Sequence, residues 1–344
     1  MSSLLVTKEY IKKIYAKNQA YIDPVLKFAM ALLVFVVINT KMGYMEKLNS
    51  VVIVLVLALF CSFMPLKTIA ILGAVFMLLH YYALAPECAL VVFAIFTIMF
   101  VLFLRFASKE TLVILLTPIF FILKIPYVMP IALGLLGGPA SIVSVSFGVV
   151  ISYLVEYTDA NAAAIMAMDS ETMMTRLRFV LEGLVGNQAM IFTMVAFGIT
   201  LIIVYTIRRM SMDHSWTVAI ISGVLADVVI LLIGDLLFDL NYSLLGIIFG
   251  SVISGLLCSG IQFFTFYVDY KRTERLQFED DEYYYYVKAV PKIAVATPDK
   301  RVKKINTKRE NVSRTAVPTS VKTAHGVART SVERVRKDEV TRRK

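Results

Sequence analysis

Long apolar runs separated by short polar connections dominate residues 25–270. An α-helix rises about 1.5 Å per residue, so roughly 20 apolar residues cross the hydrocarbon core of a bilayer. Apolar runs on this scale occur at about 25–40, 48–65, 68–86, 88–104, 110–125, 128–155, 189–207, 215–237 and 243–267. The pattern predicts an all-α polytopic integral membrane domain over residues 25–270, with polar segments 1–24 and 271–344 outside it.

The charge distribution limits how many of these nine runs cross fully. Both ends of the chain are basic, so the positive-inside rule predicts that both termini are cytoplasmic and that the number of crossings is even. The fifth and sixth runs are the exception we expect, because they carry several helix-breaking prolines and glycines. These are Pro118, Pro126, Pro130, Pro139, Gly134, Gly137 and Gly138. We predict a bundle of about eight transmembrane helices plus one broken or re-entrant segment in this region.

Two further stretches have the periodicity of amphipathic helices at a membrane interface. In residues 4–22, Tyr10, Ile11, Ile14 and Tyr15 share one face, and lysines occupy the other. This pattern suits contact with anionic headgroups, and a solvated helix is the alternative. Residues 170–186 place methionine, leucine and valine at helical spacing. That segment is predicted to lie on the outer leaflet or cap the bundle, with a binding lid as the alternative.

Composition supports a membrane protein and argues against several other classes. The 344 residues are 58% hydrophobic and 17% charged, whereas soluble domains average roughly 45–50% and about 25%. The net charge of +10 belongs to the tail, which from Tyr283 onward has 17 Lys or Arg and 5 Asp or Glu. A basic tail without interleaved aromatic residues does not predict specific nucleic-acid binding.

Catalytic and metal-binding signals are not evident in the sequence. Cys61, Cys88 and Cys258 are far apart and lie in or beside apolar runs, which is typical of buried thiols. The chain has three histidines and lacks the motifs of phosphate loops, zinc hydrolases and serine hydrolases. We therefore expect a protein that is not an enzyme and that holds no cofactor or metal.

Few ionisable residues fall inside the apolar runs, and such residues usually have a partner or a function. Asp227 lies near the middle of the eighth run, Asp235 follows on the same broad helix face, His80 lies in the third run and Lys124 in the fifth. One hypothesis is that Asp227 binds a cation or relays a proton, with Lys124 or His80 as its counter-group. The alternative is that Asp227 only hydrogen-bonds a neighbouring helix and that Asp235 and His80 serve the interfaces.

Small residues recur every four positions in two of the runs, which is typical of closely packed helices. In the sixth run these include Gly148 and Ser152, and in the ninth they include Gly246, Gly250 and Ser254. We predict that these five residues form helix-packing faces. Both runs end in tyrosine beside an acid, so an inverted-repeat carrier is an alternative explanation of their likeness.

The tyrosine run Tyr283, Tyr284, Tyr285 and Tyr286 lies just beyond the last apolar run. Its alternation favours a β-strand, and a lone strand needs an edge with which to pair. We predict that residues 278–297 dock onto a cytoplasmic protein or a second copy of the chain. The alternative is a disordered linker whose aromatic rings touch headgroups. Beyond Thr297 we predict a disordered basic tail that is attracted to anionic lipid.

Two functions compete on these observations. The proline-broken segment and Asp227 favour a multi-pass transport protein, or the membrane subunit of a transporter, for an unidentified solute or ion. The packing faces and the tyrosine run favour a non-enzymatic scaffold or assembly subunit of a bacterial envelope complex. Either function is expected in the bacterial cytoplasmic membrane, and homo-oligomers suit both.

Overall fold

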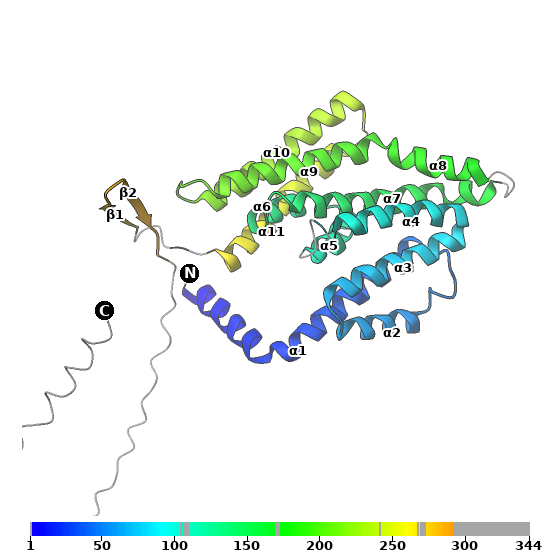
Figure 1. The fold of residues 1–344 in the computed structure, drawn as a ribbon, viewed down its shortest axis with the longest axis horizontal. Helices are drawn as coiled ribbons and strands as arrows, with labels where there is room; N and C mark the ends of the chain where they lie inside the picture. The colour runs from blue at the N-terminus through cyan, green and yellow to red at the C-terminus, as the bar shows by residue number, and fades with distance from the viewer. Residues whose placement is uncertain are drawn as a thin grey trace, which may run out of the picture. The chain divides into compact units, whose positions relative to one another are not determined.

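The computed structural model describes residues 2–103, 105, 110–168, 173–240, 242–266, 268 and 273–291 (Figure 1). Almost all of this is helix, because long apolar runs at membrane depth satisfy their backbone groups internally only as helices. The elements are α1 (Ser2–Lys41), α2 (Val51–Ser62), α3 (Leu66–Leu84), α4 (Pro86–Leu102), α5 (Thr111–Ile122), α6 (Val128–Leu136), α7 (Ser141–Ala167), α8 (Met173–Val185), α9 (Gln188–Arg208), α10 (Ser215–Phe238), α11 (Leu244–Thr265), β1 (Glu274–Glu279) and β2 (Tyr284–Ala289).

Six helical segments of the described chain are long and apolar enough to cross a membrane. They are Thr7–Lys41, Leu66–Leu84, Ser141–Ala167, Met174–Arg208, Ser215–Phe238 and Leu244–Thr265. This confirms a membrane-embedded bundle that is all-α. The apolar helices α2, α4 and α5 have 12, 17 and 12 residues, so their length alone does not establish further crossings.

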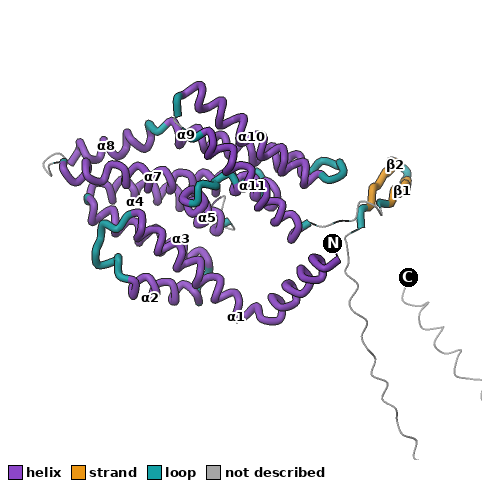
Figure 2. Tube along the Cα trace, turned by 180° about the vertical axis from the view of Figure 1, so that it is seen from behind, coloured by secondary structure: helices purple, strands orange, loops and turns teal. Residues whose placement is uncertain are grey.

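The bundle has two halves, α1–α4 and α5–α11. Within the first half, α1 packs on α2 and α3, and α3 packs on α4; within the second, α6 contacts α9, α10 and α11. Figures 1 and 2 show α1, α2 and α3 along one side, with α7, α9 and α10 along the other. The halves meet where α3 contacts α5 and α7, where α1 contacts α5, and where α4 contacts α8.

The first and last helices also touch. The Lys8 ammonium donates a hydrogen bond of 2.6 Å to the Phe263 carbonyl oxygen near the end of α11. The same ammonium lies 5.3 Å from the centre of the Phe263 ring, within the range of a cation–π contact. Because Lys8 satisfies a carbonyl that the last turn of α11 leaves open, it fixes the start of α1 against the end of α11.

Helices α5 and α6 form a short hairpin. The start of α5 and the end of α6, hereafter its two outer ends, lie at the same end of the bundle. Before α5, the Glu110 carboxylate accepts hydrogen bonds of 2.6 and 2.7 Å from Ser141 and Ser144 in the first turn of α7. After α6, the Arg208 guanidinium at the end of α9 donates to the carbonyl oxygens of Leu135 and Gly137. The hairpin turns at Leu123–Tyr127, hereafter the tip, where Lys124 has φ +62°.

Two helix boundaries differ from the predicted runs. The run 128–155 is divided into α6 and α7, because Gly137 leaves helical geometry with ψ −149° and Pro139 lacks a backbone N–H. In contrast, the predicted segments 4–22 and 25–40 are joined in one helix, α1, with a local break at Asn18. Pro24 falls inside α1 without ending it.

The second amphipathic helix, α8, packs on the bundle through its apolar face. Val180 and Leu184 are buried in the core that α1–α4 share with α7. Arg176, on another face, lies 3.6 Å from the Glu87 carboxylate at the start of α4. Helix α8 therefore packs on α4 and α7, and its position relative to the outer leaflet stays a prediction.

The tyrosine run pairs with a strand of its own chain. Strand β2 lies antiparallel to β1, with Phe278 opposite Tyr285 and Gln277 opposite Tyr286. A disordered linker therefore does not describe residues 274–289. Residues 292–344, which include the end of the predicted docking segment and the basic tail, lie outside the described residues.

We predict that the close contact between α5 and α7 makes Gly148→Ala destabilising by about 1–3 kcal/mol, the usual cost of overpacking. A Cβ at Gly148 would overlap the Thr117 side chain on α5. The matched control is Gly260→Ala on α11, where an added Cβ meets nothing within 4 Å. Thermal unfolding of both variants in detergent checks this expectation. Equal melting temperatures for the two alanine variants would contradict it.

Candidate functional site

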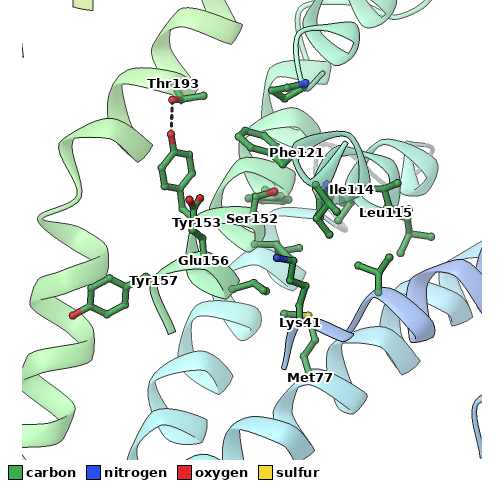
Figure 3. A pocket seen from close by; sticks show the side chains of 18 of the residues that line it. Lys41, Met77, Ile114, Leu115, Phe121, Ser152, Tyr153, Glu156, Tyr157 and Thr193 are labelled. Atoms are coloured by element: carbon green, nitrogen blue, oxygen red, sulfur yellow. Dashed lines mark hydrogen bonds between the residues drawn. The ribbon is translucent and has the colours of Figure 1, made fainter. Parts of the chain in front are cut away.

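A cleft of about 840 Å³ lies between the two halves of the bundle, beside the hydrophobic core that they share. Its walls come from α1, α3 and α4 on one side and from α5 and α7 on the other, and it continues past the tip to α9–α11. Figure 3 shows side chains from these helices converging on this space. Ligand-binding pockets usually measure about 300–1,000 Å³, so the cleft can hold a small molecule or part of a lipid.

The cleft is mainly apolar. Phenylalanine and branched aliphatic side chains cover most of its walls, including Phe96, Phe103, Ile114, Ile119 and Phe147. Its rim includes Ile71, Phe100 and Ile122, which are 48%, 46% and 41% exposed. In a membrane-embedded bundle, exposed apolar side chains such as these are the ones expected to face hydrocarbon.

Charged groups line the cleft at a few separate positions. Lys41 at the end of α1 and Glu156 on α7 both extend into the space between the halves (Figure 3). Lys67, Lys124 and Asp159 also line it. An apolar space with a few charged groups is suited to a ligand that has both an apolar and a polar part.

The tip of the α5–α6 hairpin forms part of the cleft and packs on α11. A Cβ added at Gly250 would lie 2.7 Å from a ring carbon of Tyr127 and 3.0 Å from the Lys124 carbonyl oxygen, so the contact requires glycine. The Tyr127 ring also meets the Phe197 ring edge-on at 6.1 Å. Gly250 therefore lies at the contact between the last helix and the broken segment.

Asp227 lies midway along α10, one helical turn from the cleft. Its Oδ1 accepts a hydrogen bond of 2.7 Å from the Thr200 hydroxyl on α9. Its Oδ2 is buried and has no hydrogen-bond partner among the described residues. Leu231, four residues further along α10, lines the cleft together with Phe197 and Tyr127. A layer of apolar and aromatic side chains thus separates a completely buried carboxyl group from the cleft.

Ser251 on α11 lies at about the same depth as Asp227. A Cβ at Gly255 would meet Val224, so these two positions are opposite each other on α10 and α11. The two helices are joined by a short loop and run antiparallel. Ser251 is one turn before Gly255, and Asp227 is about one turn after Val224, so Ser251 and Asp227 lie at the same level. The Ser251 hydroxyl is also buried without a partner among the described residues.

A hydrogen-bond network of hydroxyl groups lines the cleft beside the tip. Tyr153 and Thr193 are joined by a hydrogen bond of 3.0 Å, drawn as a dashed line in Figure 3. Thr193 is 2.8 Å from the Tyr242 hydroxyl, which donates to the Ala189 carbonyl oxygen at 3.0 Å. These residues were not predicted from the sequence, because they come from three distant segments and no spacing links them.

The four predicted intramembrane residues do not form one site. Asp235 accepts a hydrogen bond of 2.9 Å from the Tyr242 backbone N–H, so it holds the loop after α10. His80 is buried and accepts at Nδ1 from the Met45 N–H at 3.2 Å, which leaves Nε2 to donate to Asn39 at 2.9 Å. Lys124 lies in the cleft, where it makes no ion pair with any described carboxylate.

The predicted packing residues occupy different contacts. Gly148 faces Thr117, and Ser152 donates to the Gly148 carbonyl oxygen at 2.7 Å beside the cleft. Ser254 donates to the Gly250 carbonyl oxygen at 2.7 Å. Gly246 lies in the first turn of α11 and lines the cleft. These residues include both close helix contacts and cleft positions.

The β-hairpin presents its tyrosines to the surroundings. Tyr283, Tyr284 and Tyr286 are 62%, 68% and 78% exposed. Asp280 organises the turn, because its carboxylate accepts hydrogen bonds from the Tyr285 hydroxyl and from two backbone N–H groups, and these bonds lower the pKa of Asp280. The Lys288 ammonium lies 2.5 Å from the Asp213 carboxylate, which ties the hairpin to the α9–α10 connection.

Comparison with known proteins gives no independent support for a function. No protein-family model matches the chain, and neither a curated protein nor a solved structure shows significant similarity to it. The evidence for a function is therefore limited to the cleft, the tip and Asp227.

We predict that Thr200→Val lowers the stability of the protein by about 1–3 kcal/mol, because it removes the hydroxyl that donates to a buried carboxyl group while keeping the side-chain volume. Thr200→Ser keeps the hydroxyl and is the control. Denaturant unfolding in detergent, monitored by the loss of the helical circular-dichroism signal, measures the difference in the free energy of unfolding. If the valine and serine variants were equally stable, Thr200 would not support Asp227.

We predict that the hairpin contact is lost in acid. The hydrogen bond from Lys288 lowers the pKa of Asp213 from its ordinary value of 3.8. A carboxyl group with a lowered pKa in the folded state stabilises that state above its ordinary pKa, and the stabilisation is lost as the pH falls through the lowered value. Amide hydrogen exchange over β2, corrected for intrinsic rates, should therefore be unchanged from pH 7 to about pH 5 and should rise below pH 3.8.

The matched variant Lys288→Gln should show the faster exchange already at pH 7. Its pH dependence should be flatter, because the pKa of Asp213 is no longer lowered by a cationic partner. Identical exchange profiles for the variant and the unmodified chain would show that this ion pair does not hold the hairpin.

Proposed function

We propose that this chain is a multi-pass transport protein that moves a solute through the cleft between its two halves. The observation that carries the proposal is the position of a buried carboxyl group, Asp227, one helical turn from a large cleft that contains a broken helix pair. Broken helices at membrane depth are tolerated where protein or a cavity covers them, and intramembrane acids usually serve ion or proton pathways.

The proposed topology has eight crossings and a re-entrant α5–α6 hairpin. Helices α5 and α6, with 12 and 9 residues, are about 18 and 14 Å long, against a hydrocarbon core of about 30 Å. Helix α2 also has 12 residues, so the re-entrant assignment rests on where the chain enters and leaves the hairpin and not on helix length. The hydrogen bonds at Glu110 and Arg208 keep the two outer ends at one end of the bundle. Helices α1–α4, α7 and α9–α11 then cross, and both termini face the cytoplasm of a bacterial cell.

Asp227 is the proposed coupling group. Its unpartnered oxygen can accept a proton or contribute to a cation site together with the Ser251 hydroxyl. Tyr127 and Leu231 separate it from the cleft, so a small movement of the tip would open access from that side. The proposal assigns no enzymatic step to the chain.

The experiment that tests transport measures access to the cleft from both sides of the membrane. A cysteine at Ile151, which lines the cleft on α7, is exposed to a membrane-impermeant maleimide in right-side-out and in inside-out vesicles. We expect labelling from both sides, with Asp227→Asn suppressing labelling from one of them. The three native cysteines are buried and can remain in place.

The control is a cysteine at Val229, which is 51% exposed on α10 and lies outside the cleft. It should react from neither side, because maleimides label cysteine poorly in hydrocarbon, where the reactive thiolate is disfavoured. If Ile151→Cys reacted from one side only, with or without Asp227→Asn, the cleft would be static and the transport proposal would fail.

A scaffold function is the second candidate, and the exposed hairpin supports it. Three tyrosines in β2, with Tyr283 just before it, offer an aromatic surface and a strand edge to a cytoplasmic partner or a second copy of the chain. Under this proposal, removal of residues 273–344 abolishes co-purification of the partner from native membranes, whereas Asp227→Asn leaves it unchanged. If the truncation left co-purification unchanged and Asp227→Asn abolished activity, the transport function would be favoured.

A further inference from the structure

We infer that the cleft is a binding site for a bilayer phospholipid with an anionic headgroup, whose phosphate is held by Lys124 at the tip. This inference rests on the transport function proposed above and names its substrate class. The occupant enters from the membrane, places its acyl chains against the phenylalanine-rich walls and brings its headgroup to the polar end of the cleft.

The rim of the cleft favours the bilayer as the source of the ligand. Ile71 on α3, Phe100 on α4 and Ile122 on α5 belong to three different helices, and all three are exposed at the cleft. An opening bounded by apolar side chains gives a hydrated solute no favourable path, whereas an acyl chain crosses it without losing contact with hydrocarbon. The walls behind this rim continue to be apolar, which suits acyl chains over most of the cleft.

The charge inside the cleft favours an anionic headgroup. Three lysines line the cleft, Lys41, Lys67 and Lys124, against two acids, Glu156 and Asp159. Lys41 shares its end of the cleft with Glu156 (Figure 3), so its charge is partly balanced there. Lys124 has no carboxylate partner among the described residues. It lies at the tip of a helix hairpin that is re-entrant in the proposed topology, so its ammonium group is there at membrane depth. An ammonium group in such a place is stabilised by an anion, and a phosphate diester supplies one.

Polar groups near the tip can complete the headgroup site. Tyr153, Thr193 and Tyr242 line the same cleft and are joined through their hydroxyl groups, and a hydroxyl that turns away from its present acceptor can donate to a phosphate oxygen instead. Ile122, at the rim, is two residues from Lys124. A lipid can therefore reach Lys124 with its headgroup while its chains remain at the apolar opening.

The test measures bound lipid and not transport, so the two proposals can fail separately. The full chain is reconstituted with equal amounts of phosphatidylglycerol and phosphatidylcholine and extracted in mild detergent, and its bound lipids are identified by native mass spectrometry. We expect phosphatidylglycerol to be retained in preference. Lys124→Gln should reduce this retention about fivefold, the scale expected for one cation acting on an anionic lipid. Lys47→Gln, which changes an exposed lysine outside the cleft, should have no effect.

A second pair of variants tests the location without changing charge. Ala74→Trp fills the cleft from α3 and should abolish retention of phosphatidylglycerol. Val75→Trp adds the same side chain to the neighbouring residue, which is exposed and outside the cleft, and should leave retention unchanged.

Three results would overturn the inference. If the two lipids were retained equally, the site would have no preference for an anionic headgroup. If Lys124→Gln and Lys47→Gln retained equal amounts of phosphatidylglycerol, Lys124 would not bind the phosphate. If both tryptophan variants retained equal amounts, the lipid would bind outside the cleft. If phosphatidylglycerol binds as expected but Ile151→Cys is labelled from one side only, the lipid site stands and the transport proposal falls.

Discussion

Every backbone amide and carbonyl at membrane depth has to find a partner inside the protein, and the break between α5 and α6 makes that constraint acute. Ending two helices within the bundle exposes backbone groups that a continuous helix would satisfy. At the break, the Lys124 and Ile125 N–H groups donate to the carbonyl oxygens of Phe121 and Phe120. At the opposite ends of the hairpin, Arg208 donates to two carbonyl oxygens at the end of α6, and Glu110 joins the start of α5 to α7 through two serine hydroxyls. These contacts make the interruption a stable part of the fold, and the tip that it creates lines the cleft.

The same interruption brings together groups that would otherwise lie on separate helices. The tip contacts α11 through Gly250 and approaches α9 through the Tyr127–Phe197 ring contact. Asp227 on α10 lies just behind this layer, held on one side by Thr200. A movement of the tip would therefore change both the shape of the cleft and the surroundings of the buried carboxyl group. Such a shared element is what the proposed coupling between a substrate and an ion requires.

The sequence predicted the membrane-embedded helical bundle well, because a run of apolar residues at membrane depth has few structures available other than a helix. It also located the broken region, because Pro126, Gly137 and Pro139 fall where the helices are interrupted. The prediction was wrong for Pro118, Pro130 and Gly134, which lie inside α5 and α6. The cleft could not be predicted, because it depends on how α1 and α3 approach α5 and α7 across large separations in sequence. Asp227 stood out as an intramembrane acid, but its bond to Thr200 depends on the rotation of two helices. Strand β1 was missed because its charged sequence does not resemble a strand without its partner.

The bond between Lys8 and the Phe263 carbonyl oxygen has a consequence for how the protein is made. These two residues are 255 positions apart, so the first helix completes its contacts only after the last helix has been synthesised and inserted. Until then, α1 must remain in the membrane with its first turns unattached, close to the translocation machinery or to lipid headgroups. Closure of the bundle is therefore a late step of biogenesis, and a chain interrupted before α11 would present an unfinished amino-terminal helix to membrane quality control.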